Sequence, residues 1–168
     1  SSYIIVADGI VSPGGYSPSP AFGLSIFDQA REEASMAGMT DVLVYHGVTD
    51  APPVDVNELA QVGGTLIDNL LFREFRGYTP LNPLDYVLSV ADSSNSVVVG
   101  EYLAPLQTLG LQDSALTILA SGFLDTSLNS GGAQFGLWVA LPEGGPLVEL
   151  PTSTAPVQVI HNAADVAA

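Results

Sequence analysis

The chain has 168 residues, of which 47% are hydrophobic and only 12% are charged, so it fits one domain or a tightly fused pair and is neither disordered nor a coiled coil. Eighteen acidic residues stand against three arginines, lysine and cysteine are absent, and the net charge is −15. This charge repels phosphate backbones and anionic lipid, which argues against nucleic acid as a partner. The absence of cysteine excludes disulfides.

Short apolar runs predict β-strands along the whole chain, because they are rich in Val, Ile, Leu and aromatic residues and are bounded by Gly, Pro, Asn, Asp and Ser. Many short strands with regular turn signals are typical of sandwiches, so we predict an all-β fold, an antiparallel β-sandwich. Weaker runs predict edge strands near 54–56, 65–67 and 70–72. The main strands are expected at 3–7, 22–27, 42–45, 86–91, 97–103, 115–120, 135–141 and 157–160.

Two connections in the N-terminal part differ in character. The segment SPGGYSPSP at 12–20 is expected to be a surface loop, with the alternative that Tyr16 and the prolines form a contact between subunits. The segment DQAREEASMAGM at 28–39 holds good helix formers but has a weak apolar stripe. We expect it to be a connection with at most a short helix.

One passage of the chain occurs twice, which predicts that a module was duplicated. Six residues recur 113 positions later and four others recur 115 positions later. The first set is Ile5, Ala7, Gly9, Phe22, Gly23 and Leu24, repeated as Ile118, Ala120, Gly122, Phe135, Gly136 and Leu137. The second set is Val42, Val44, His46 and Asp50, repeated as Val157, Val159, His161 and Asp165.

The register of the repeat divides the chain into three parts. Residues 42–154 make one complete β-sandwich module, residues 1–41 correspond to the last strands of a preceding module, and residues 155–168 to the first strand of a following one. The module is therefore duplicated out of phase, and its outer strands need hydrogen-bonding partners. Either the two copies pair within one chain, or the last strand is donated to a neighbouring subunit. The expected assembly residues are Val157, Val159 and Ile160.

The passage VLVYHGVTDAPPVDV at 42–56 carries one histidine and two carboxylates. His46, Asp50 and Asp55 are candidate ligands for zinc or another divalent metal, with Asp50 and Asp55 the weak metal candidates. Calcium, held by loop carboxylates and carbonyls, is the cofactor considered. The favoured interpretation is a structural turn in which Asp50 accepts backbone N–H groups and His46 supports the end of the strand. The residues assigned to this turn and its repeat are His46, Asp50, Pro52, Asp55, His161 and Asp165.

The same passage resembles the opening of the secreted module called domain of unknown function 4397, in which a strand runs into a His-Ala-Ser-Pro-Asp-Ala-Pro-like turn and then Val-Asp-Val. The resemblance covers about 42–150, with partial copies at 1–41 and 155–168. It implies a β-sandwich of bacterial cell-surface and secreted proteins, often in tandem, without an established enzymatic activity. The matching residues are His46, Asp50, Ala51, Pro52, Val54, Asp55, Val56, Phe75, Gly77, Tyr78, Pro83 and Tyr86.

The sequence contains no nucleophile elbow, phosphate loop, His-Glu-x-x-His pair or EF-hand loop, so we expect no enzyme and no cofactor, with a carboxylate-dependent hydrolase the remotest alternative. The predicted function is that of an extracellular structural protein that joins copies of itself into a filament or surface layer by β-strand contacts. The alternative is a cell-surface module that binds carbohydrate or calcium, with Trp138 as a stacking platform or as a packing residue. No apolar run predicts membrane insertion.

Overall fold

The computed structural model describes residues 2–153, and these residues form eleven β-strands and one 3-10 helix. No helix within this part has the length and apolar character needed to cross a bilayer. The elements are β1 (Ile4–Asp8), β2 (Gly23–Phe27), β3 (Thr40–His46), β4 (Val54–Glu58), β5 (Gly64–Leu70), β6 (Phe75–Leu81), β7 (Asp85–Asp92), β8 (Val98–Pro105), β9 (Ala115–Ser121), η1 (Thr126–Leu128), β10 (Gly136–Ala140) and β11 (Val148–Glu149).

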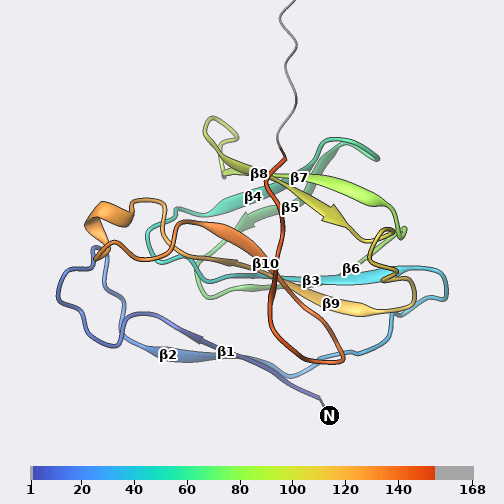
Figure 1. Cartoon of the computed structure of the whole chain (residues 1–168), viewed down its shortest axis with the longest axis horizontal. Helices are drawn as coiled ribbons and strands as arrows, with labels where there is room; N and C mark the ends of the chain where they lie inside the picture. The colour runs from blue at the N-terminus through green and yellow to red at the C-terminus, as the bar shows by residue number, and fades with distance from the viewer. Residues whose placement is uncertain (1, 154–168) are drawn as a thin grey trace, which may run out of the picture.

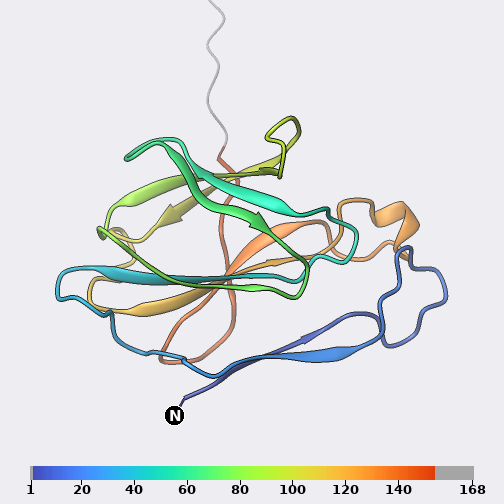
Figure 2. The same ribbon diagram turned by 180° about the vertical axis from the view of Figure 1, so that it is seen from behind.

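The strands form three stacked layers (Figure 1). The middle layer is a five-stranded sheet in the order β11-β10-β9-β3-β6, and a four-stranded sheet in the order β5-β4-β7-β8 covers one of its faces. The β1–β2 hairpin lies on the opposite face of the middle layer, as the view from behind also shows (Figure 2). The predicted all-β sandwich is confirmed.

One pair of neighbouring strands is parallel, whereas the other strand pairs of the described sheets are antiparallel. Strands β3 and β9 run in the same direction, with Val44 opposite Ile118 and His46 opposite Ala120. All residues of β3 are buried, because the strand is covered by the four-stranded sheet on one side and by the hairpin on the other. Burial on both faces explains why its sequence, TDVLVYH, is largely apolar rather than alternating.

The hydrophobic core lies between the four-stranded and five-stranded sheets. Alternate residues of β3 and β9 face the core, among them Val42, Val44, Leu116 and Ile118. The opposing sheet contributes, among others, Val54, Val56, Leu88 and Val90. This alternation is what a sandwich requires of its inner faces.

Several details of the strand prediction differ from the structure, and the two-residue strand β11 was also not predicted. The run at 54–56 was expected at an edge, but β4 is central in its sheet, since its backbone pairs with β5 on one side and with β7 on the other. The runs at 65–67 and 70–72 do not form two strands: β5 includes the first run and Leu70, whereas residues 71 and 72 belong to the connection that leads to β6. Strand β6 was not predicted, since Gly77 and Pro80 are strand breakers; it lies at a sheet edge, where a missing proline N–H is tolerated.

The connection at 28–39 contains no helix, within the expectation of at most a short one. Its polar side chains instead tie it to the middle layer. The Arg31 guanidinium forms a 2.8 Å ion pair with the buried carboxylate of Asp41 and lies over the ring of Tyr78. The backbone N–H of Ser35 donates to the same carboxylate at 2.9 Å. The predicted strand at 157–160 lies outside the described residues.

The hairpins β1–β2 and β9–β10 have the same register. Ala7 pairs with Leu24, and 113 positions later Ala120 pairs with Leu137. Beyond the strands, Ile10 N–H donates to Pro20 O at 2.8 Å, and Phe123 N–H donates to Ala133 O at 2.9 Å.

A glycine begins the turn of both hairpins, with φ of +78° at Gly9 and +92° at Gly122. A Cβ atom at either glycine would collide with the carbonyl oxygen across the hairpin, that of Ala21 or Gln134. The recurrence of a glycine at the same place in both hairpins therefore has a steric reason.

Candidate functional site

His46 is completely buried at the end of β3. Its Nε2 atom lies 3.2 Å from Pro52 O, and the backbone N–H of Val48 donates to Nδ1 at 3.3 Å. Because Nδ1 accepts a hydrogen bond, the proton of the neutral imidazole is on Nε2 and is donated to the carbonyl. Burial lowers the pKa of His46, and the hydrogen bond to Pro52 opposes this only partly. The ring is thus held neutral inside the turn.

Asp50 joins the turn after β3 to the loop after β9. Its carboxylate accepts the backbone N–H groups of Leu124 at 3.0 Å and Asp125 at 2.9 Å. The side-chain amide of Asn129 donates to the same carboxylate at 3.1 Å. Through these three donors Asp50 ties the turn after β3 to the loop after β9.

Asp55 is buried on β4 and has its own donors. The backbone N–H of Asn69 donates to one oxygen at 2.7 Å, and the side-chain amide of Asn95 donates to the other at 2.6 Å. His46, Asp50 and Asp55 therefore make separate contacts and do not converge on a common point. Among residues 2–153, no group of three His, Cys, Asp or Glu side chains is placed to hold a metal ion.

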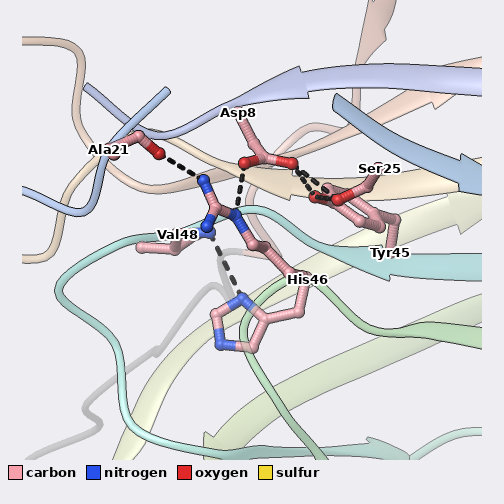
Figure 3. A network of polar contacts seen from close by, with 7 residues as sticks. Asp8, Ala21, Ser25, Tyr45, His46 and Val48 are labelled. Atoms are coloured by element: carbon pink, nitrogen blue, oxygen red, sulfur yellow. Dashed lines mark hydrogen bonds and ion pairs between the residues drawn. The ribbon is translucent and has the colours of Figure 1, made fainter. Parts of the chain in front are cut away.

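A partly buried polar network holds the β1–β2 hairpin against the middle layer (Figure 3). The carboxylate of Asp8 accepts hydrogen bonds from Ser25 Oγ at 2.6 Å and from the Tyr45 hydroxyl at 2.7 Å. The Arg73 guanidinium pairs with the same carboxylate at 2.5 Å and also donates to Ala21 O. The network joins β1, β2, β3 and the loop before β6.

The protonation states in this network follow from burial and from the donors. Burial raises the pKa of Asp8, but hydrogen bonds from Ser25, Tyr45 and Arg73 outweigh it, so the pKa lies below the ordinary value of 3.8. Burial is also the main reason that the pKa of Tyr45 rises to about 12. At neutral pH the network is therefore an ionised carboxylate with a full set of donors, which is suited to fixing the hairpin in place.

Sequence reasoning did not identify this network or the buried carboxylate of Glu58. Asp8 and Arg73 are 65 residues apart, and no local pattern relates them. Glu58 accepts the backbone N–H groups of the turn that follows β4, from residues 60 to 63, at 2.8–3.0 Å. The motif ELAQVGG, in which an acid precedes a Gly-containing turn, was the only available signal for Glu58.

The outer face of the β1–β2 hairpin is apolar and exposed. The register places its large side chains on one face of the hairpin, and this face is turned away from the middle layer. The exposed fractions are 59% for Tyr3, 61% for Ile5, 53% for Phe22, 60% for Leu24 and 59% for Ile26. We call these five side chains the hairpin face.

The equivalent side chains of the β9–β10 hairpin are in the core. Ile5 corresponds to Ile118, which is 4% exposed, and Leu24 corresponds to Leu137, which is 3% exposed. In β9–β10 this face is covered by the four-stranded sheet, whereas no described element covers the hairpin face. Two hairpins of the same register therefore differ in what covers them.

A second surface feature is a groove of about 570 Å³ between β8 and β10. It is lined by the aromatic side chains of Tyr102, Phe135 and Trp138 and by the polar groups of Gln134 and Glu149. The rings of Tyr102 and Phe135 meet edge to face with centroids 6.0 Å apart.

Five of the residues singled out in the sequence, namely Val157, Val159, Ile160, His161 and Asp165, lie outside the described residues. Comparison of the chain with protein-family models, with curated proteins and with solved structures gives no match.

Proposed function

We propose that the protein is an extracellular or cell-surface structural subunit that joins copies of itself into a filament or layer through the β1–β2 hairpin. The observation that supports this proposal is the hairpin face, whose side chains are half or more exposed, whereas the equivalent side chains of β9–β10 are buried or half-buried. In soluble proteins a contiguous exposed apolar patch marks an interaction surface.

The Asp8 network supports the same proposal, because it fixes the hairpin from its inner side and leaves the outer side free. Asp8 itself is 8% exposed, and Phe27 packs on Phe75 with ring centroids 5.4 Å apart. A surface that is held rigid loses little conformational entropy when a partner binds. The hairpin is thus a preorganised contact surface.

The extracellular location is supported by composition and by the resemblance to a secreted module. The chain has no cysteine or lysine and is rich in acidic residues, with 17 glycines and 12 prolines. The net charge of −15 limits non-specific association between copies, so that association depends on a specific apolar surface.

The test is to make the hairpin face polar without changing its strand propensity. The double substitution Leu24→Thr with Ile26→Thr is expected to abolish oligomers in sedimentation velocity at micromolar concentration and filaments in electron microscopy. The matched control is Val62→Thr with Val97→Thr, at positions that are 68% and 61% exposed and follow β4 and β7 of the four-stranded sheet. Equal assembly of both variants would contradict the proposal.

A second candidate function, carbohydrate binding, is favoured by the groove at Trp138. The half-buried rings of Phe135 and Trp138, with Tyr102 buried beneath them, lie beside the polar groups of Gln134 and Glu149. They offer both apolar surface and hydrogen-bonding groups, the usual composition of a small-molecule site. A glycan array, followed by calorimetry with the strongest hit and with calcium, tests this function. Binding that is lost in Trp138→Ala would support it, and no hits and no heat would remove it.

A further inference from the structure

We infer that residues 157–161 of one copy add to β1 of another copy as a parallel strand, in the register that places Val159 opposite Ile5. This inference rests on the proposed function and adds to the contact made by the hairpin face a second contact, at the open edge of β1. It is carried by three observations: the β3–β9 pairing, the open edge of β1, and the distance between that edge and the place where the described chain ends.

The template is the parallel pair β3–β9, in which Val44 lies opposite Ile118. Val159 is the repeat of Val44, 115 positions later, and Ile5 is the repeat of Ile118, 113 positions earlier. The hairpins that contain Ile5 and Ile118 share their register, so the offset of the β3–β9 pairing applies unchanged to a strand paired with β1. The same shift places Val157 opposite Tyr3.

The edge of β1 that corresponds to the β3 side of β9 is open. In the described sheets β9 has β10 on one side and β3 on the other, whereas β1 pairs only with β2. An open edge presents unpaired backbone N–H and C=O groups, and an added strand satisfies them. A segment that repeats β3 is the matching occupant.

The side chains of this segment suit the two faces of the hairpin. In β3, Val42 and Val44 face the same core as Leu116 and Ile118 of β9. By the same alternation Val157 and Val159 would extend the hairpin face, next to Tyr3 and Ile5. A slip by one residue would instead place Gln158 on this apolar face, so the register is specified.

The segment cannot reach β1 of its own chain. Ser153 N–H donates to Glu101 O at 2.8 Å, so the described chain ends against β8 of the four-stranded sheet. The hairpin lies on the far side of the middle layer (Figure 1). Two sheet spacings amount to about 20 Å, whereas the four residues from Ser153 to Val157 span at most about 14 Å. Donor and acceptor are therefore different copies.

The contact is head-to-tail, because the donated segment and the receiving edge are different surfaces of the same chain. Contacts of this kind give open filaments unless the rotation between copies closes a ring.

The contacts of Asp50 predict an additional hydrogen-bonded contact between the copies. Asp50 accepts the N–H groups of Leu124 and Asp125, so its repeat, Asp165, would accept those of Val11 and Ser12.

The test uses paired cysteines in the full chain, which contains no other cysteine. Residues opposite each other in adjacent strands lie within disulfide range. Under mild oxidation the pair Ile5→Cys with Val159→Cys is expected to give a ladder of covalent oligomers on non-reducing gels. In a mixture of isotopically light and heavy chains, mass spectrometry is expected to find disulfides that join a light chain to a heavy chain.

The matched control is Val6→Cys with Val159→Cys, which is one residue out of register and on opposite faces; it is expected to give at least tenfold less product. The pair Tyr3→Cys with Val157→Cys repeats the test at a second place in the same register. A disulfide within single chains, equal yields from the control, or no ladder from either in-register pair would overturn the inference. If sedimentation still shows oligomers, only the inference fails; if the chain stays monomeric, the proposed function fails too.

Discussion

The hydroxyl of Tyr45 donates a 2.7 Å hydrogen bond to the carboxylate of Asp8, and this contact joins the middle layer to the β1–β2 hairpin. The two residues lie 37 positions apart in the chain. Tyr45 belongs to the strand that serves as the template for the proposed donated segment, and Asp8 ends the strand that would receive it. The fixed hairpin thus offers its other face and its edge to a partner.

Replacing Asp8 with Ala should detach the hairpin, because it leaves Arg73, Ser25 and Tyr45 without their common acceptor. The expected loss is about 2–3 kcal/mol in the free energy of unfolding, the size for buried hydrogen bonds to a charged group. Chemical denaturation followed by circular dichroism measures it. Asp28→Ala, which removes an exposed carboxylate just after β2, is the control and should change stability little. Equal effects would mean that the network does not hold the hairpin.

Glu58 should make stability depend on acid. Burial raises the pKa of this carboxyl, but the hydrogen bonds from residues 60–63 dominate and lower it from 4.5 to about 2. Because the folded-state pKa lies below the unfolded value, the stabilisation is fully present above pH 4.5 and is lost as the pH falls toward 2.

The substitution Glu58→Gln should cost about 1–3 kcal/mol at neutral pH and should flatten the decline in stability between pH 4.5 and 2. Urea denaturation at several pH values compares it with the original chain and with Glu143→Gln, a change at an exposed site. An unchanged decline in Glu58→Gln would assign the acid sensitivity to other carboxylates.

Gly9 and Gly122 should be equally intolerant of a side chain. Both have positive φ, and in both a Cβ atom would collide with a backbone carbonyl across the hairpin. Alanine at either position should cost about 1–3 kcal/mol. Gly14→Ala is the control, because a Cβ atom there meets nothing within 4 Å. Thermal unfolding of the three variants would refute the shared steric role if Gly9→Ala and Gly14→Ala behaved alike.

Association between copies should strengthen with salt. Each copy carries a net charge of −15, so copies repel one another at long range. Raising the salt concentration from about 0.1 M to about 1 M shortens the screening length from about 10 Å to about 3 Å, and apolar contacts persist. Light scattering should therefore show larger species at high salt. Dissociation at high salt would indicate that ion pairs, rather than the hairpin face, hold the copies together.

The strands were predictable where apolar residues cluster between turn residues, as in Val42–Tyr45 and Tyr86–Ala91. Strand β6 was not predictable, because Gly77 and Pro80 fit a strand only at the edge of a sheet. Which strand lies at the edge depends on tertiary contacts. The same holds for the parallel pairing of β3 with β9, whose residues lie more than seventy positions apart.

The site was predictable only in part. The passage that holds His46, Asp50 and Asp55 was singled out from residue types and spacing, but the donors to Asp50 come from the distant loop after β9, and Asp55 lies on β4 rather than in the turn. That Asp8 meets Arg73 could not be inferred, since the contact depends on how the hairpin docks. The exposure of Ile5 and Leu24 is equally invisible in the sequence, where they look like their buried repeats, Ile118 and Leu137.

The most direct measurement is the size of the intact chain in solution, by sedimentation velocity from low to high micromolar concentration. A subunit that offers the hairpin face and the β1 edge to its neighbours should sediment as a concentration-dependent series of oligomers, with extended particles in electron microscopy. A single monomeric boundary throughout this range, with no particles larger than one chain, would contradict the proposed assembly.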